Sequence, residues 1–207
     1  MRNIMLKVID GLGKYGLDKL ERALLFGAVL VSILALATGS IQLSQAWLTF
    51  LFRWLHVLSG VMWIGLLWYF NFVQIPSMPK IPDEQKPAIS KVIAPTALFW
   101  FRWAALSTVI TGLILATLNG YLVQSMLLGY FKGDQATYIG LGMWLGLIMA
   151  YNVWMIIWPN QQKALGLVTA SDDERKAAAR TAMLTSRFNT MFSIPMLYFM
   201  VAAQNLV

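Results

Sequence analysis

The sequence predicts an all-α, polytopic membrane protein with about five transmembrane helices and an N-terminal amphipathic helix on the membrane surface. Of the 207 residues, 58% are hydrophobic and 12% are charged, whereas about 25% are charged in soluble domains. The apolar segments are continuous rather than alternating, and each has about 20 residues, the length that a helix needs to cross a bilayer. Because the chain has no cysteine, disulfides, cysteine-ligated metals and haem attached through Cys-x-x-Cys-His are excluded.

Five segments are expected to cross the bilayer, at 23–43, 51–74, 97–119, 138–158 and 187–206. The first is rich in Leu, Val and Ala and is interpreted as an uncleaved anchor. A cleaved signal peptide is the alternative, since Ala35-Leu-Ala37 resembles a cleavage site. The fourth is expected to stop at Trp158-Pro159. The fifth contains Pro195, which removes one helical hydrogen bond and is expected to kink the helix.

Three further segments lie outside these spans. Residues 3–21 place apolar and charged side chains on opposite stripes, which predicts a surface helix and divides the chain into a cytoplasmic amphipathic segment, 1–22, and one transmembrane domain, 23–207. The loop 76–95 holds five of the seven prolines and is expected to be extended, with a helical turn around 83–90. Ser171-Asp-Asp-Glu174 predicts a capping box for a helix over 171–184, which either extends the fifth span or lies flat.

The distribution of positive charge predicts the orientation. All of the 16 lysines and arginines except Arg53 and Lys132 fall at the same ends of the predicted spans. The positive-inside rule then places the N-terminus in the cytoplasm and the C-terminus on the outer side of the membrane. The net charge of +7 is therefore a signal of topology, and nucleic acid is not an expected partner.

The second span carries the only histidine of the chain. At 100° per residue, one face of this helix holds six positions: Arg53, His56, Ser59 with Gly60, Trp63, Leu67 and Gln74. A stripe that mixes polar and small residues is expected to face protein or a cavity rather than lipid. Two interpretations stay open. Either Arg53 reaches the outer headgroups and His56 only bonds another helix, or His56 binds haem iron, transfers a proton or contacts a ligand.

A haem b would need a second axial ligand or an open position beside His56. With one histidine per chain, a second imidazole would have to come from another subunit; a methionine of the same chain is the alternative, from among Met62, Met126, Met143 and Met196. Haem b is therefore the candidate cofactor and haem iron the candidate metal, with Arg53 and Trp63 as the other candidate cofactor-binding residues.

The remaining polar residues point mainly to helix packing. Asn152 and Asn189 are expected near the cytoplasmic face, paired with each other or with Arg102 and Arg187. None of the nine acidic residues lies in the middle of a span, which argues against a proton pump or cation-coupled transporter that uses intramembrane carboxylates.

Several separated motifs resemble, in order, those of the bacterial membrane urate hydroxylase family. They are Phe52-Arg-Trp-Leu-His-Val-Leu-Ser-Gly-Val-Met-Trp-Ile-Gly-Leu66 with Tyr69-Phe-Asn-Phe-Val-Gln74, Ala97-Leu-Phe-Trp-Phe-Arg-Trp103, Asn152-Val-Trp-Met-Ile-Ile-Trp-Pro-Asn-Gln161 and Ser186-Arg-Phe-Asn-Thr-Met-Phe-Ser-Ile-Pro-Met196. The resemblance implies a multi-helix domain of the bacterial inner membrane that is associated with urate oxidation, and the outer side that holds the C-terminus would then be the periplasm. The candidate functional positions that it implies are Arg53, His56, Trp63, Asn152, Asn160 and Arg187.

Family members typically continue into a C-terminal c-type cytochrome, which this sequence does not contain, so the resemblance is to a short form whose electrons would pass to a separate cytochrome c. Two hypotheses follow. In the first, the chain is a redox-associated membrane protein that acts through His56. In the second, it is a non-catalytic accessory subunit of a larger respiratory or photosynthetic complex, or a homo-oligomer, with Gly140, Gly142 and Gly146 allowing close contact with a partner helix.

Overall fold

The computed structural model describes residues 2–131 and 134–206, and over these residues it contains helices and no strands. Lys132, one of the two basic residues predicted to lie outside, is not among them. The chain forms two compact units, Met1–Leu48 and Thr49–Val207, which are described separately.

In the N-terminal unit the predicted surface helix is interrupted. Helix α1 spans Arg2–Leu12 and continues as the π-helix η1, Gly13–Leu17, while α2 starts only at Leu20 and ends at Ala37. The prediction of one helix over 3–21 is therefore wrong in its second half. Gly16 has a φ of 126°, in the left-handed region that favours glycine, and Lys19 is extended, so the helical hydrogen bonds cannot continue.

In the second unit the proline-rich segment is mostly helical. Helix α3, Gln45–Trp68, continues through η2 (Tyr69–Gln74) and α4 (Ile75–Ser77) to η3 (Met78–Lys80), and α5 (Lys86–Ala88) leads through η4 (Ile89–Ile93) into α6 (Ala94–Leu118). The expectation of an extended loop over 76–95 is therefore wrong for 76–80 and for 86–95, which are helical, and only 81–85 lie outside the helices. Four of the prolines lie in the first two positions of a helical segment, and those of α4 and α6 directly follow the π-helical turns η2 and η4 of the same runs.

The C-terminal part contains two long helical runs. After α7 (Leu122–Met126) and η5 (Leu128–Phe131), α8 (Gln135–Tyr151) continues through η6 (Asn152–Ile157) into α9 (Trp158–Ala164), so the predicted stop at Pro159 is wrong. Helix α10 spans Asp172–Asn205 and runs through Pro195. Its predicted capping box is confirmed: Ser171 and Glu174 cap each other's backbone N–H groups. Residues 172–184 are thus continuous with the last helix.

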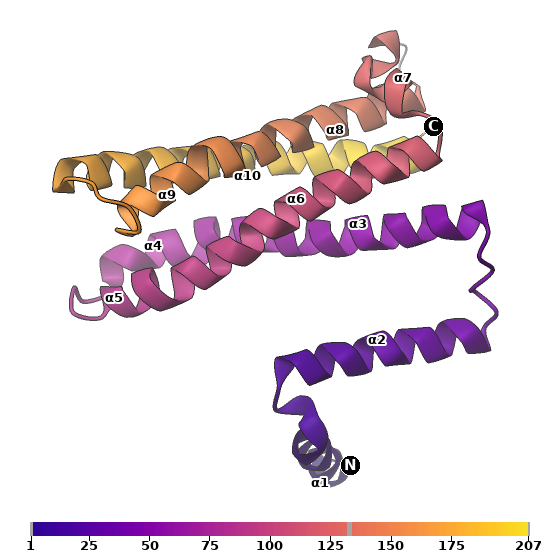
Figure 1. The fold of residues 1–207 in the computed structure, drawn as a ribbon, viewed down its shortest axis with the longest axis horizontal. Coiled ribbons are helices and arrows are strands. Elements are labelled where there is room, and N and C mark those ends of the chain that lie inside the picture. Colours follow the sequence, from indigo (N-terminus) through magenta and orange to yellow (C-terminus); the bar gives the residue numbers. More distant parts are fainter. Residues whose placement is uncertain (1, 132–133, 207) are drawn as a thin grey trace. The chain divides into compact units, whose positions relative to one another are not determined.

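Within the second unit, α3, α6, α8 and α10 pack with alternating direction (Figure 1). At one end, Nη1 of Arg53 donates to Oε1 of Gln204 at 3.2 Å, and Nε2 of Gln135 donates to the carbonyl of Ala203 at 3.0 Å. The turn between α4 and α5 and the turn that follows α9 lie at the other end of the bundle. The ends that the charge pattern predicts to share one side of the membrane are therefore neighbours in space.

Four helical runs in the described residues are long and apolar enough to cross a membrane. They are Leu20–Ala37, Gln45–Lys80, Lys86–Leu118 and Gln135–Ala164. The predicted fifth span lies in α10, whose charged first half and buried polar residues lower its mean hydropathy. Where α10 packs along α8 and η6, three of its polar side chains, Ser186, Asn189 and Ser193, are buried within the protein.

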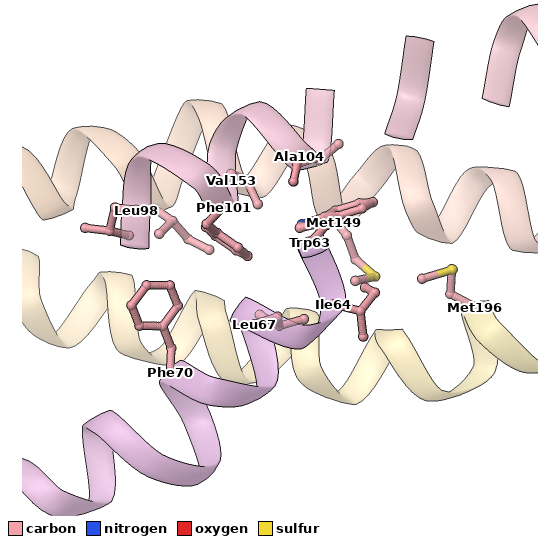
Figure 2. Close-up of a cluster of buried hydrophobic side chains, with 13 residues drawn as sticks. Trp63, Ile64, Leu67, Phe70, Leu98, Phe101, Ala104, Met149, Val153 and Met196 are labelled. Atoms are coloured by element: carbon pink, nitrogen blue, oxygen red, sulfur yellow. The ribbon is translucent and has the colours of Figure 1, made fainter. Parts of the chain in front are cut away.

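The hydrophobic core lies where α3 and η2 meet α6, α8, η6 and α10 (Figure 2). Trp63, Leu67 and Met149 are each at most 1% exposed, and the ring of Phe70 meets that of Phe101 edge to face at 5.6 Å. This core holds one face of α3 against α6 and α10, and thereby fixes the positions of the polar residues on that face.

Candidate functional site

The predicted stripe of α3 and η2 does face protein. At the end of the stripe nearest the C-terminus, Arg53 bonds Gln204 of α10. Three positions contact α6: His56 bonds it, the hydroxyl of Ser59 lies 2.9 Å from that of Ser107, and Gly60 lies against Thr108. Trp63 and Leu67 are buried in the core, and Oε1 of Gln74 is also buried. The helical periodicity of the sequence therefore identified the contact face of α3 correctly.

His56 is held against α6 by a backbone hydrogen bond. Its Nδ1 lies 2.8 Å from the carbonyl oxygen of Thr108 and 3.4 Å from Oγ1 of Thr111. A carbonyl can only accept, so Nδ1 carries the hydrogen, and in the neutral ring Nε2 is the nitrogen with the free lone pair. Nε2 makes no hydrogen bond to the described residues. A Cβ on Gly112 would lie 2.8 Å from Cε1 of His56, so only glycine lets the ring approach α6 this closely.

Arg53 and Trp63 have separate surroundings. Arg53 links α3 to the end of α10 and lies near Tyr121, whose pKa is raised by burial and lowered to a lesser degree by the charge of Arg53. Trp63 is 1% exposed, and its Nε1 has no acceptor among the described residues. Ten residues of helix separate the two by about 15 Å along α3. The structure thus places the three predicted cofactor-binding residues along one helix face and does not gather them in one pocket.

A second polar group crosses the middle of the bundle. Nδ2 of Asn152 donates to Oδ1 of Asn189 at 2.8 Å, and Nδ2 of Asn189 donates to the carbonyl of Met149 at 2.9 Å. The predicted pairing of the two asparagines is confirmed, and the alternative partners lie elsewhere: Arg102 is stacked on Trp158 and Arg187 is exposed. Asn160, the other polar position that the resemblance singled out, bonds the carbonyl of Ile156 in its own helical run.

Two contacts next to this pair were missed by sequence reasoning. Nδ2 of Asn71 donates to Oγ of Ser186 at 2.8 Å, and Nε1 of Trp68 donates to Oγ of Ser193 at 3.0 Å. Asn71 falls in the apolar run of the second span, and the only signal for it was its polarity there, since amides in hydrocarbon need partners.

Asn71 and Asn152 both lie in π-helical segments, η2 and η6. Such wide turns are frequent at functional sites, because they shift the following residues around the helix. Buried around η2 are two acceptors without a donor among the described residues, Oδ1 of Asn71 and Oε1 of Gln74. Chemically, this interior donates and accepts hydrogen bonds through amides, hydroxyls and an indole.

The described residues meet one requirement of a haem site. A histidine whose Nδ1 donates to a backbone carbonyl is oriented as ligating histidines are, with Nε2 left for the iron. The single histidine cannot supply a second imidazole. Among the described residues no group of three His, Cys, Asp or Glu side chains could hold another metal ion.

The fold and these contacts define a helical protein with runs long and apolar enough to cross a membrane, in which several buried polar groups bond between helices. The comparison with known families agrees with the resemblance in the C-terminal part: the model of the urate oxidase N-terminal family matches residues 121–205. This region runs from the start of α7 to the end of α10 and includes Asn152, Asn160 and Arg187, but not α3. No curated protein and no solved structure matches the chain.

Proposed function

We propose that this chain is a multi-pass inner-membrane protein of the urate hydroxylase type that acts in urate oxidation. The observation that carries the proposal is the family match over 121–205, in a chain with four helices apolar enough to cross a membrane. The π-helical segment η2 adds two buried acceptors that have no donor among the described residues, Oδ1 of Asn71 and Oε1 of Gln74, and a purine would need such groups for recognition.

In this proposal α10 provides a fifth crossing. The N-terminus is cytoplasmic, α1 lies on the inner membrane surface, and the C-terminus is periplasmic. The support is the distribution of basic residues, together with the antiparallel packing that brings Arg53 beside Gln204. The apolar side chains Met5, Ile9 and Leu12 are each at least 46% exposed within their own unit, as expected of a helix that rests on lipid.

His56 is proposed as the residue through which the chain takes part in redox chemistry, as a haem ligand or a proton carrier, with a separate cytochrome c as electron acceptor. The hydrogen bond from Nδ1 to Thr108 supports this role, because it leaves Nε2 available and fixes the ring against α6. Bound haem would supply one-electron chemistry at this position.

The test is an absorption spectrum, a haem extraction and a urate-consumption assay on the purified protein in lipid, with oxidised cytochrome c added. We expect a Soret band and urate-dependent reduction of cytochrome c, both lost in His56→Ala. The matched control is Ser59→Ala, which removes a hydrogen bond from the same α3–α6 contact without touching the imidazole. A colourless wild type would refute the haem role. Urate consumption that survives His56→Ala would refute the redox role of this residue.

The alternative is the non-catalytic accessory subunit, and one observation favours it. His56, Ser59, Asn152 and Asn189 all bond other parts of this chain, as polar residues that secure helix packing do. The glycines of α8 fit this alternative less well, because Gly140 lies against the carbonyl of Ser125 and Gly142 against Met200, within the chain itself. Co-purification of a stable larger complex with no urate turnover would support the accessory role.

A further inference from the structure

Arg102 is a cation within the predicted third span, and it is held by aromatic rings. It lies on α6, two turns from the helix start, and its Cζ is 3.3 Å from the ring centroid of Trp158 and 5.6 Å from that of Trp154. Its Nε donates to the carbonyl of Leu98 at 3.1 Å. Cation–π contact with two indoles and the bond from Nε restrain the guanidinium and leave the two Nη groups as donors.

Among the described residues no carboxylate forms an ion pair with this charge. The ion pairs in the described residues are Lys86 with Asp83 and Lys176 with Asp173, both outside the predicted spans. The Nη groups of Arg102 have no hydrogen-bond acceptor among the described residues either. Because an unpaired charge in hydrocarbon is costly, an arginine in this position is expected to have a counter-ion that the protein itself does not provide.

Next to Arg102 lies an apolar groove of about 410 Å³ between α6 and the α8–η6 run. Its lining includes Leu106, Val109, Ala150, Tyr151, Trp154 and Met155. Leu106 and Val109 follow Arg102 at helical spacing, about 6 and 10 Å deeper along α6. Trp154 belongs both to the groove and to the surroundings of Arg102, so the cation lies at the end of the groove nearer the predicted cytoplasmic surface.

We propose that this groove is a binding site for an anionic phospholipid, with the phosphate on Arg102 and an acyl chain along the groove. A planar guanidinium binds phosphate oxygens through two N–H groups, and basic residues between transmembrane helices at the inner surface suit anionic headgroups. The apolar walls distinguish a lipid from a free anion, because a small phosphate would leave the groove unfilled. The proposal does not depend on urate chemistry.

The experiment titrates the purified full-length chain in detergent with phosphatidylglycerol or phosphatidylcholine of identical chains, and native mass spectrometry counts the bound lipid. Wild type is expected to prefer phosphatidylglycerol, and Arg102→Gln to lose about fivefold in that preference, the worth of one interfacial basic contact. Arg102→Lys keeps the charge but not the planar stack, and it is expected to fall between the two. The matched control, Arg180→Gln, removes an exposed cation of α10 and is expected to bind as wild type does.

Two further arms test the groove itself. Met155→Trp adds bulk at a side chain that is 62% exposed, so it leaves the fold intact even if Arg102→Gln does not fold, and it is expected to weaken both lipids. Glycerol phosphate, the soluble part of the headgroup, is expected not to displace the lipid. Equal phosphatidylglycerol preference in wild type and Arg102→Gln, unchanged binding in Met155→Trp, or displacement by glycerol phosphate at lipid-like concentrations would each overturn the proposal.

Discussion

The contact between His56 and Gly112 offers a sharp test of how α3 is held against α6. In Gly112→Ala, the new Cβ would lie 2.8 Å from Cε1 and 3.0 Å from Nδ1 of His56, closer than atoms of neighbouring side chains approach. The ring cannot swing away without loss of its hydrogen bond to the carbonyl of Thr108. The substitution is therefore expected to destabilise the protein and to displace the imidazole.

The magnitude follows from three contributions. Alanine in place of glycine within a helix stabilises by about 1 kcal/mol. Overpacking of a closely fitted contact costs about 1–3 kcal/mol, and an interhelical hydrogen bond in a membrane protein contributes about 0.6 kcal/mol, at most about 1.7. We expect the free energy of unfolding to fall by a net amount on the order of 1–2 kcal/mol. The two unfavourable contributions outweigh the gain from alanine because the new Cβ would clash with two atoms of the imidazole ring. Gly146→Ala on α8 is the matched control, since its Cβ would meet nothing within 4 Å and only the gain should remain.

The assay is reversible unfolding in mixed micelles, measured for four chains: wild type, Gly112→Ala, His56→Ala and the double variant. If the clash with the ring is the cause, Gly112→Ala should be neutral or stabilising in the His56→Ala background, because the ring is gone. A loss of stability that is the same in both backgrounds would refute this reasoning, since the methyl group would then meet something other than His56.

Two further predictions concern α10. Asn189→Ala removes the acceptor of Asn152 and the donor to the carbonyl of Met149, so it should lower the free energy of unfolding by about 1–3 kcal/mol in the same assay. The control Asn205→Ala removes only a bond within its own helix and should change the free energy of unfolding little. Equal effects of the two substitutions would contradict the interhelical role of Asn189. Bonds from the backbone and hydroxyl of Ser171 lower the pKa of Glu174 below its ordinary value, so its cap stabilises the first turn of α10 at neutral pH and should be lost as the pH falls through that lowered pKa. The protection factors of the amides in this turn, which divide out the intrinsic pH dependence of hydrogen exchange, should therefore fall in acid, and protection factors that do not change with pH would count against the cap.

Much of the fold could be predicted because bilayer physics leaves few choices. Long apolar runs must be helices, and the mixed stripe through Arg53, His56 and Trp63 had to face protein. The pairing of Asn152 with Asn189 followed from the need of buried amides for partners. The errors at the prolines came from judging each proline by its usual effect, although Pro159 directly follows the wide turn η6 and the helical run continues through it.

By itself, then, the sequence determined the class of protein, the apolar helices and the face of α3 that meets its neighbours, since composition and periodicity are properties of one segment at a time. Only the tertiary structure decided that His56 bonds a backbone carbonyl beside Gly112, that Asn71 reaches Ser186, and that Arg102 stacks on Trp158 above an apolar groove. These contacts depend on how far each helix is shifted and rotated against the next. That register results from the packing of the whole core, including the wide turns η2 and η6, and no single segment encodes it.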